Sequence, residues 1–198
     1  MSNSVVIENA ILSYPNLFAP KCPKGSTTPK YSATFILPEG YDTTEIKAAI
    51  AQAKADKWAG NVPGELKSQI KKVKDGPYAG RICIATNAGE DYPPKVVDQN
   101  VNPMMDKSQI FAGCVVNAAV GFFGYNTGSN GVGCGLNMVQ LVSNQNVTRL
   151  DGAQDAKDVF KKVAGATAPA ATTPTAAATT SAAATADDLV EPSGDDFL

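Results

Sequence analysis

The sequence predicts a mainly β domain built around a curled antiparallel sheet, and segment 109–142 is the main reason. Two long apolar runs there flank a connection rich in glycine and asparagine. In the first run every second residue from Ile110 to Phe122 is apolar, which predicts a strand with one fully buried face. The connection ends in Asn130-Gly131, a pair typical of a hairpin turn.

The opposite face of that first run has an unusual composition for a surface. It mixes aromatic, glycine, aliphatic and amide residues and carries no charge: Phe111, Gly113, Val115, Asn117, Ala119, Gly121, Phe123 and Tyr125. A plain solvated face would carry charged side chains, so this one could hold a ligand. Glycines at 133 and 135 open the return strand and indicate a bulge or a close approach of another chain segment.

The elements before this hairpin follow from local patterns. Residues 4–14 predict a first strand, which Pro15 and Pro20 should end. Residues 21–30 predict an exposed loop rich in Lys, Gly, Pro and Thr. Residues 30–37 alternate between apolar and polar positions, which predicts a second strand.

A helix is predicted at 43–57. Its start, residues 42–45, resembles a capping box, and apolar residues follow at helical spacing: Ile46, Ala49, Ile50 and Ala53. Further along, residues 80–86 predict another strand. The stretch 87–106 is rich in Pro and Asn and predicts an irregular excursion with a short strand at 95–97.

Charge is unevenly distributed along the 198 residues. Residues 1–164 hold 17 Lys and Arg against 14 Asp and Glu, a net charge of +3. Residues 165–198 hold five Asp and Glu and no Lys or Arg, a net charge of −5. A mildly basic body therefore carries an acidic tail.

Composition divides the chain into three parts. Residues 1–163 suit a single domain, which ends in a short helix at 153–163. Residues 164–186 are almost entirely Ala, Thr and Pro, which predicts a disordered linker because such residues cannot offset the entropy of ordering. Residues 187–198 form an acidic tip.

Residue types that most enzymes need are missing. The absence of histidine removes histidine base catalysis, the hydrolase triads that depend on it and most zinc sites. Nucleotide-binding glycine motifs and the nucleophile elbow are absent. The cysteines form no C-x-x-C pair and are expected to be reduced core thiols: Cys22, Cys83, Cys114 and Cys134. The loop carboxylates lack the spacing of a magnesium site: Glu90, Asp91, Asp98 and Asp106. We expect no catalysis, no cofactor and no metal.

No stretch reaches the ~18 apolar residues needed to cross a bilayer. The first residues also lack a basic segment followed by a long apolar run. We therefore expect a cytoplasmic protein with no membrane partner.

The positive signal is the interleaving of aromatic residues with Lys and Arg. Single-stranded nucleic acid is bound by a basic groove that follows the phosphates and by aromatic side chains on which bases stack. The stacking candidates are Tyr31, Trp58, Tyr78, Tyr92, Phe111, Phe123 and Tyr125. The phosphate-binding candidates are Lys30, Lys71, Lys72, Lys74, Arg81 and Lys95. Alternatively, Tyr31 belongs to the core, Trp58 packs the helix end and the lysine run is an ordinary solvated surface.

The acidic tip combines acidic pairs with apolar residues: Asp187, Asp188, Asp195, Asp196, Phe197 and Leu198. On a disordered tether such a peptide can compete weakly with DNA for a basic groove and can present its apolar end to another protein. The alternative is a purely solubilising acidic tail. That alternative accounts for the aspartates but not for the Phe-Leu pair.

Several segments together resemble tailed-phage single-stranded-DNA-binding proteins of the OB-fold type. The resemblance lies in residues 30–38, 57–58, 78–80, 93–98 and above all 110–140. It covers roughly residues 5–150, and the tail is similar in kind to those of phage and bacterial single-strand binders. The helix at 43–57 departs from the simplest OB order, because it follows the second predicted strand instead of the third. The tip also ends on Phe-Leu, where such tips commonly end on Phe.

The resemblance implies an OB-fold-type five-stranded barrel with one main helix, no catalysis and sequence-tolerant binding of single-stranded DNA. It implies work in phage replication, recombination or repair in the cytoplasm of the infected host cell. The tip would then recruit phage or host replication and recombination proteins. A homodimer fits the sequence as well as a monomer does. The alternative from another class is a phage structural or assembly protein with a β-rich body and a flexible arm.

Overall fold

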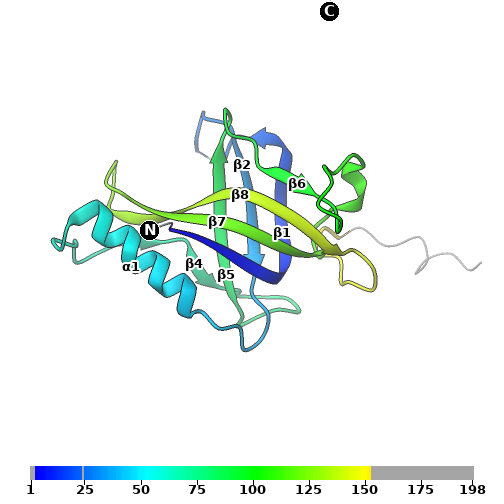
Figure 1. The fold of residues 1–198 in the computed structure, drawn as a ribbon, viewed down its shortest axis with the longest axis horizontal. Helices are drawn as coiled ribbons and strands as arrows, with labels where there is room; N and C mark the ends of the chain where they lie inside the picture. The colour runs from blue at the N-terminus through cyan, green and yellow to red at the C-terminus, as the bar shows by residue number, and fades with distance from the viewer. Residues whose placement is uncertain (1–2, 24, 153–198) are drawn as a thin grey trace, which may run out of the picture. The chain divides into compact units, whose positions relative to one another are not determined.

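The computed structural model of the protein describes residues 3–23 and 25–152 (Figure 1). The helix predicted at 153–163, the linker and the acidic tip lie outside the described residues. The strands are β1 (Ser4–Lys21), β2 (Lys30–Ile36), β3 (Lys67–Ser68), β4 (Ile70–Lys72), β5 (Ile82–Gly89), β6 (Lys95–Val97), β7 (Val115–Tyr125) and β8 (Gly131–Ser143). The helices are α1 (Thr44–Trp58) and the 3-10 turn η1 (Lys107–Gln109).

Five of these strands close into a barrel. β1 pairs with β2 and β7, β2 pairs with β5, and β7 pairs with β8, all antiparallel. A parallel contact between Asn87 of β5 and Gly135 of β8 closes the ring. Side chains on the inner face form the core, where Phe35, Ile84 and Val116 are fully buried. The predicted mainly β, OB-type five-stranded barrel with one main helix is therefore confirmed.

The first strand is longer than predicted, because β1 continues past both Pro15 and Pro20. Tyr14 adopts a φ of 47°, and the pairing of β1 with β2 shifts register between Ser13 and Asn16. Pro15 therefore falls in a bulge, where the ladder needs no hydrogen bond from its nitrogen. The prediction that Pro15 ends the strand is wrong.

The first strand of the predicted hairpin begins later than expected, at Val115, and is preceded by η1 and a turn. The Cys114 N–H donates to the Phe111 carbonyl (3.2 Å), and Gly113 adopts a φ of 113°, a conformation that favours glycine. The apolar alternation continues through the turn because turn residues also face the core. Phe111 consequently does not share a strand with Phe123.

Helix α1 packs mainly against β7 and comes between the second and third barrel strands along the chain. Its apolar spacing is as predicted, since Ile46, Ala49 and Ala53 are buried. At its start the Asp42 carboxylate accepts hydrogen bonds from the N–H (2.9 Å) and the hydroxyl (2.6 Å) of Thr44. These two hydrogen bonds lower the pKa of Asp42. The N-cap residue, Thr43, makes no side-chain capping hydrogen bond, so the resemblance to a capping box does not extend to its hydrogen bonds.

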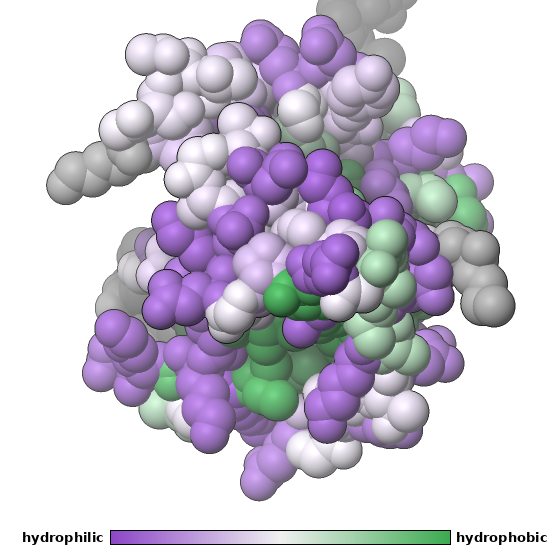
Figure 2. Space-filling model, turned by 90° about the vertical axis from the view of Figure 1, so that its left-hand side faces the viewer, coloured by the Kyte–Doolittle hydropathy of each residue, from purple (hydrophilic) through white to green (hydrophobic). Residues whose placement is uncertain are grey.

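The surface on the side of α1 is largely hydrophilic. Figure 2 views the molecule from that side and shows hydrophilic side chains around a hollow with hydrophobic side chains at its base. Among the residues that the structure describes, no helix is long and apolar enough to cross a membrane.

Candidate nucleic-acid interface

Two aromatic rings lie on glycines at the outer face of β7 and β8. Phe123 pairs with Gly133 and Tyr125 pairs with Gly131 in the β7–β8 ladder. Side chains alternate between the two faces of a strand, and Phe122 is buried in the core, so Phe123 points outward. Phe123 is 47% exposed.

The two glycines have no side chains, so the two rings can lie flat against the sheet. A Cβ atom at Gly133 would stand 2.5 Å from Cζ of Phe123, and one at Gly131 would stand 2.5 Å from Oη of Tyr125. Such approaches are far closer than van der Waals contact, so any larger residue would push the rings away. We call the surface formed by Phe123, Tyr125, Gly131 and Gly133 the aromatic–glycine face.

One lysine borders the aromatic–glycine face, and a second lies on the nearby strand β4. Lys67 of β3 pairs with Gly131, and Lys71 of β4 pairs with Cys83 of β5. Both lysines are exposed, whereas Ile70 between them packs against the core. Burial raises the pKa of the Cys83 thiol, so this group stays neutral beside Lys71 at physiological pH. The lysine charges therefore remain available to an anionic ligand.

A second group of predicted residues meets at Gly89 of β5. Lys30 of β2 pairs with Gly89, and Cδ2 of Tyr92 lies 3.7 Å from the position of a Cβ on that glycine. Tyr92 is 77% exposed. Tyr92 and Lys95 line a pocket of about 400 Å³ together with Asn137 of β8. Residues from three separate segments are thus brought together.

The bridge between β5 and β8 joins this group to the aromatic–glycine face. Asn87 pairs with Gly135 in that bridge. Cε1 of Phe123 lies 3.8 Å from the position of a Cβ on Gly135. Asn87 and Gly89 lie two residues apart and so face the same side of β5. A continuous outer strip of small and polar residues therefore connects Phe123 with Tyr92.

The β4–β5 hairpin holds a third group of predicted residues. The Arg81 guanidinium carbon lies 5.2 Å from the centroid of the Tyr78 ring, and its Nη2 lies 3.6 Å from a carboxylate oxygen of Glu39. Arg81 and Glu39 also line a pocket of about 500 Å³. Lys72 and Lys74 are exposed on the same hairpin. Tyr78 and Arg81 thus contact each other in a group separate from the aromatic–glycine face.

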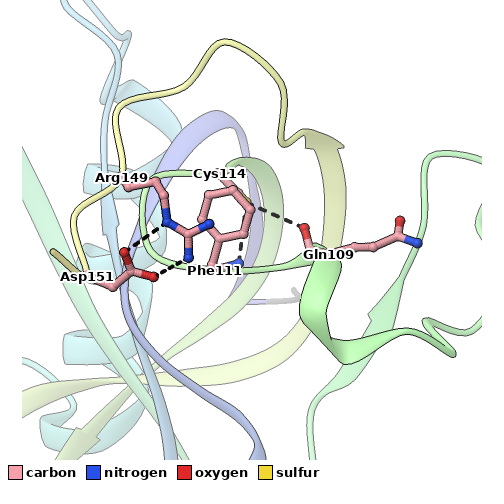
Figure 3. Close-up of polar contacts among 5 residues, drawn as sticks. All are labelled: Gln109, Phe111, Cys114, Arg149 and Asp151. Atoms are coloured by element: carbon pink, nitrogen blue, oxygen red, sulfur yellow. Dashed lines mark hydrogen bonds and ion pairs between the residues drawn. The ribbon is translucent and has the colours of Figure 1, made fainter. Parts of the chain in front are cut away.

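Phe111 lies against the segment that follows β8 (Figure 3). The guanidinium carbon of Arg149 is 3.9 Å from the ring centroid, and the guanidinium donates two hydrogen bonds to Asp151, of 2.7 and 3.1 Å. Behind the ring, the Cys114 thiol donates to the Gln109 carbonyl (3.7 Å). Burial raises the pKa of Cys114. A cation therefore covers one face of Phe111.

Two further predicted aromatics lie at the edge of the core. Trp58, at the end of α1, packs against the core, and its Cζ3 would stand 3.0 Å from a Cβ at Gly124. Tyr31 is half-buried on the strand face that also presents the buried Ala33 and Phe35. A stacking role for Trp58 and for Tyr31 stays a prediction.

Sequence reasoning assigned no nucleic-acid role to Lys67, Asn87 or Asn137, and it interpreted Gly131 and Gly133 only as turn, bulge or close-approach residues. The sequence did contain a signal. Aromatic residues at 123 and 125 and glycines at 131 and 133 are each spaced two residues apart, so the two pairs can face each other across the turn. That match becomes visible only when the hairpin register is known.

Comparison with known proteins points to bacteriophages. The family model described as Enterobacter phage Enc34, ssDNA-binding protein, matches residues 3–169. The putative protein p50 of Acyrthosiphon pisum secondary endosymbiont phage 1 is 32% identical over 153 residues, which cover 69% of this chain and 82% of that protein.

Two solved structures have a similar fold at lower identity. The single-stranded DNA-binding protein of bacteriophage Enc34 in complex with ssDNA is 19% identical, with a TM-score of 0.64 over 73% of this chain and 89% of that chain. The single-stranded DNA-binding protein gp2.5 of bacteriophage T7 is 15% identical, with a TM-score of 0.56 over 85% of this chain and 100% of that chain. The two solved structures share the fold of this chain, and the family model matches most of its length: this chain belongs to the Enc34 phage single-stranded-DNA-binding protein family.

Proposed function

We propose that the protein binds single-stranded DNA with little sequence preference, on the aromatic–glycine face and the strip that leads to Tyr92. One observation carries this proposal: two rings lie flat on glycines, with Phe123 exposed and Tyr125 half-buried, and the exposed Lys67 lies beside them. Every base has a flat π surface, so stacking on such rings does not depend on sequence. Family membership supports the same conclusion.

The energies expected from this surface suit a single-strand binder. Each base stacked on an aromatic side chain contributes about 1–3 kcal/mol. Lys67, Lys71, Lys30 and Lys95 would neutralise phosphates, which makes affinity fall as salt rises. No catalytic step is proposed.

Fluorescence anisotropy of a labelled oligo-dT, titrated with the full chain at two salt concentrations, tests the proposal. We expect saturable binding and a slope of log K against log salt of about −0.7 for each phosphate neutralised. A duplex of the same length serves as the control and should bind more weakly. No binding of oligo-dT at low salt would contradict the proposal.

In the cell we propose that the protein coats single strands during phage replication, recombination or repair, in the host cytoplasm. The acidic tip at 187–198 would compete with DNA and recruit replication and recombination proteins, as acidic residues beside Phe197 and Leu198 suit both tasks. Deleting the tip should tighten binding to oligo-dT and abolish capture of a partner from infected-cell extract. Unchanged DNA affinity after deletion would contradict the competition.

A further inference from the structure

The aromatic–glycine face has a shape that favours some single strands over others. We propose that Phe123 and Tyr125 take two successive bases lying flat and side by side, so that the face binds any single strand but modestly favours unstacked, pyrimidine-rich ones. Gly133 is the positioning residue that holds the Phe123 ring in this orientation. The inference rests on the proposed binding of single-stranded DNA and concerns the form of the strand that is bound.

The orientation of the Phe123 ring follows from three distances. A Cβ at Gly133 would lie 2.5 Å from Cζ, 2.7 Å from Cε2 and 3.1 Å from Cε1 of Phe123. If the Cβ position lay in the ring plane beyond Cζ, its distances to both Cε atoms would be clearly longer than these. The position therefore lies over the face of the ring, and since a Cβ points away from the sheet, the ring lies parallel to the sheet.

Tyr125 has the same orientation by the same argument. A Cβ at Gly131 would lie 2.5 Å from Oη and 2.6 Å from Cζ of Tyr125, which places it over the bond between these two atoms. The two rings thus form one flat platform instead of standing on edge. Their outer faces are the surfaces on which bases can stack.

The spacing of the two rings determines how two bases can be arranged on them. Residues two apart on an antiparallel strand are about 7 Å apart, at about 3.4 Å per residue. Bases within a stacked strand lie face to face at about 3.4 Å. Two bases placed side by side on Phe123 and Tyr125 must therefore separate from each other. Pyrimidine runs stack less strongly on themselves than purine runs and lose less energy in doing so.

Gly133 is well suited to test this geometry, because the three atoms nearest to an added Cβ there all belong to the far end of the Phe123 ring. At Gly131 an added Cβ would also meet the Lys67 carbonyl oxygen at 2.8 Å, so that variant would disturb the backbone. Gly64 offers a control outside the aromatic–glycine face and the strip that leads to Tyr92. A Cβ there would meet no atom within 4 Å.

The experiment compares dissociation constants of the full chain for oligo-dT and oligo-dA of equal length, by anisotropy. The wild type should prefer oligo-dT by about threefold or more. Gly133→Ala should weaken oligo-dT binding about fivefold and reduce the dT preference, because the tilted ring no longer offers a flat face. Gly64→Ala should change either constant less than twofold. Far-UV circular dichroism confirms that each variant is folded.

A double-mutant cycle separates positioning from a general structural effect. Phe123→Ala should weaken oligo-dT binding about fivefold or more, and adding Gly133→Ala to it should change nothing further. A further loss in the double variant would overturn the role of Gly133, as would equal effects of Gly133→Ala and Gly64→Ala. A wild-type preference for oligo-dA would overturn the side-by-side platform. Failure of the wild type to bind any oligonucleotide would instead contradict the proposed function.

Discussion

Phe111 and Phe123 carry the same side chain, and both fall on the same alternating apolar segment, yet their surroundings differ. The Phe111 ring carries the Arg149 guanidinium on one face at 3.9 Å and packs against the core. The Phe123 ring rests on Gly133 and turns its other face outward. The first ring fastens two chain segments together, and the second leaves a face open for a ligand.

The difference lies in what stands opposite each ring. Gly133 and Gly131 offer no side chain, so the rings of Phe123 and Tyr125 can lie on the sheet without being covered. At Phe111, Gly113 provides the turn that lets the segment after β8 approach, because a Cβ at Gly113 would collide with the Thr148 carbonyl oxygen. Glycine thus exposes one aromatic ring and allows the other to be covered.

The largest effect is expected from removing the open platform. The double variant Phe123→Ala/Tyr125→Ala should lose about 2–6 kcal/mol of binding free energy for oligo-dT, the sum of two stacks. Anisotropy measures the loss. Its free energy of unfolding in urea should fall by less than its binding free energy, since Phe123 is 47% exposed and Tyr125 is half-buried. Oligo-dT affinity within twofold of wild type would show that the platform does not bind bases.

The opposite pattern is expected at the covered ring. Phe111→Ala should lower the free energy of unfolding by about 2 kcal/mol, through lost packing and the lost contact with Arg149. Urea unfolding followed by circular dichroism measures this. Its oligo-dT affinity, measured under conditions where the variant is folded, should stay within twofold of wild type. A tenfold loss of affinity would place Phe111 in the DNA site.

A smaller effect is expected from the lysines. Lys67→Ala should make the slope of log K against log salt less negative by about 0.7, because Lys67 lies beside Gly131 on the open face. Lys107 is a matched control, since its ammonium lies 5.4 Å from the Phe18 ring centroid and outside the aromatic–glycine face. Equal slopes of log K against log salt for Lys67→Ala and Lys107→Ala would contradict the placement of the DNA beside Lys67.

The smallest effect concerns a thiol behind the covered ring. Burial raises the pKa of Cys114, so its thiolate fraction is low at pH 8 and iodoacetamide should modify it slowly. Phe111→Ala reduces that burial, which should lower the pKa and speed modification. Mass spectrometry of the alkylated peptides measures the rate. Cys134, whose pKa burial raises to about 12, is the internal control and should stay unmodified in both proteins.

Much of the fold was predictable because burial follows simple periods. Phe35, Ile84 and Val116 are buried where alternation predicted a strand face, and the apolar spacing of α1 predicted its packed side. The failures came from backbone conformations that composition does not reveal. Tyr14 at a φ of 47° places Pro15 in a bulge, and Gly113 at 113° delays the start of β7.

The interface was less predictable because it depends on pairing between distant segments. Sequence reasoning proposed Phe111, Phe123 and Tyr125 as one group, because all three occupy odd-numbered positions and would lie on the same face of one strand. The glycines opposite Phe123 and Tyr125 and the arginine over Phe111 become known only from the register of β7 with β8 and the course of the chain after β8. The two-residue alternation of a strand predicts on which face a side chain lies, but it does not predict which other residues cover that side chain.

The central claim is that single-stranded DNA lies on the open ring and not on the covered one. Photo-crosslinking of an oligonucleotide carrying 5-iodo-2′-deoxyuridine, followed by mass-spectrometric mapping, tests this most directly, because this base crosslinks to aromatic side chains stacked on it. The account predicts crosslinks at Phe123 and Tyr125 and none at Phe111. Crosslinks at Phe111, with none at Phe123 or Tyr125, would contradict it.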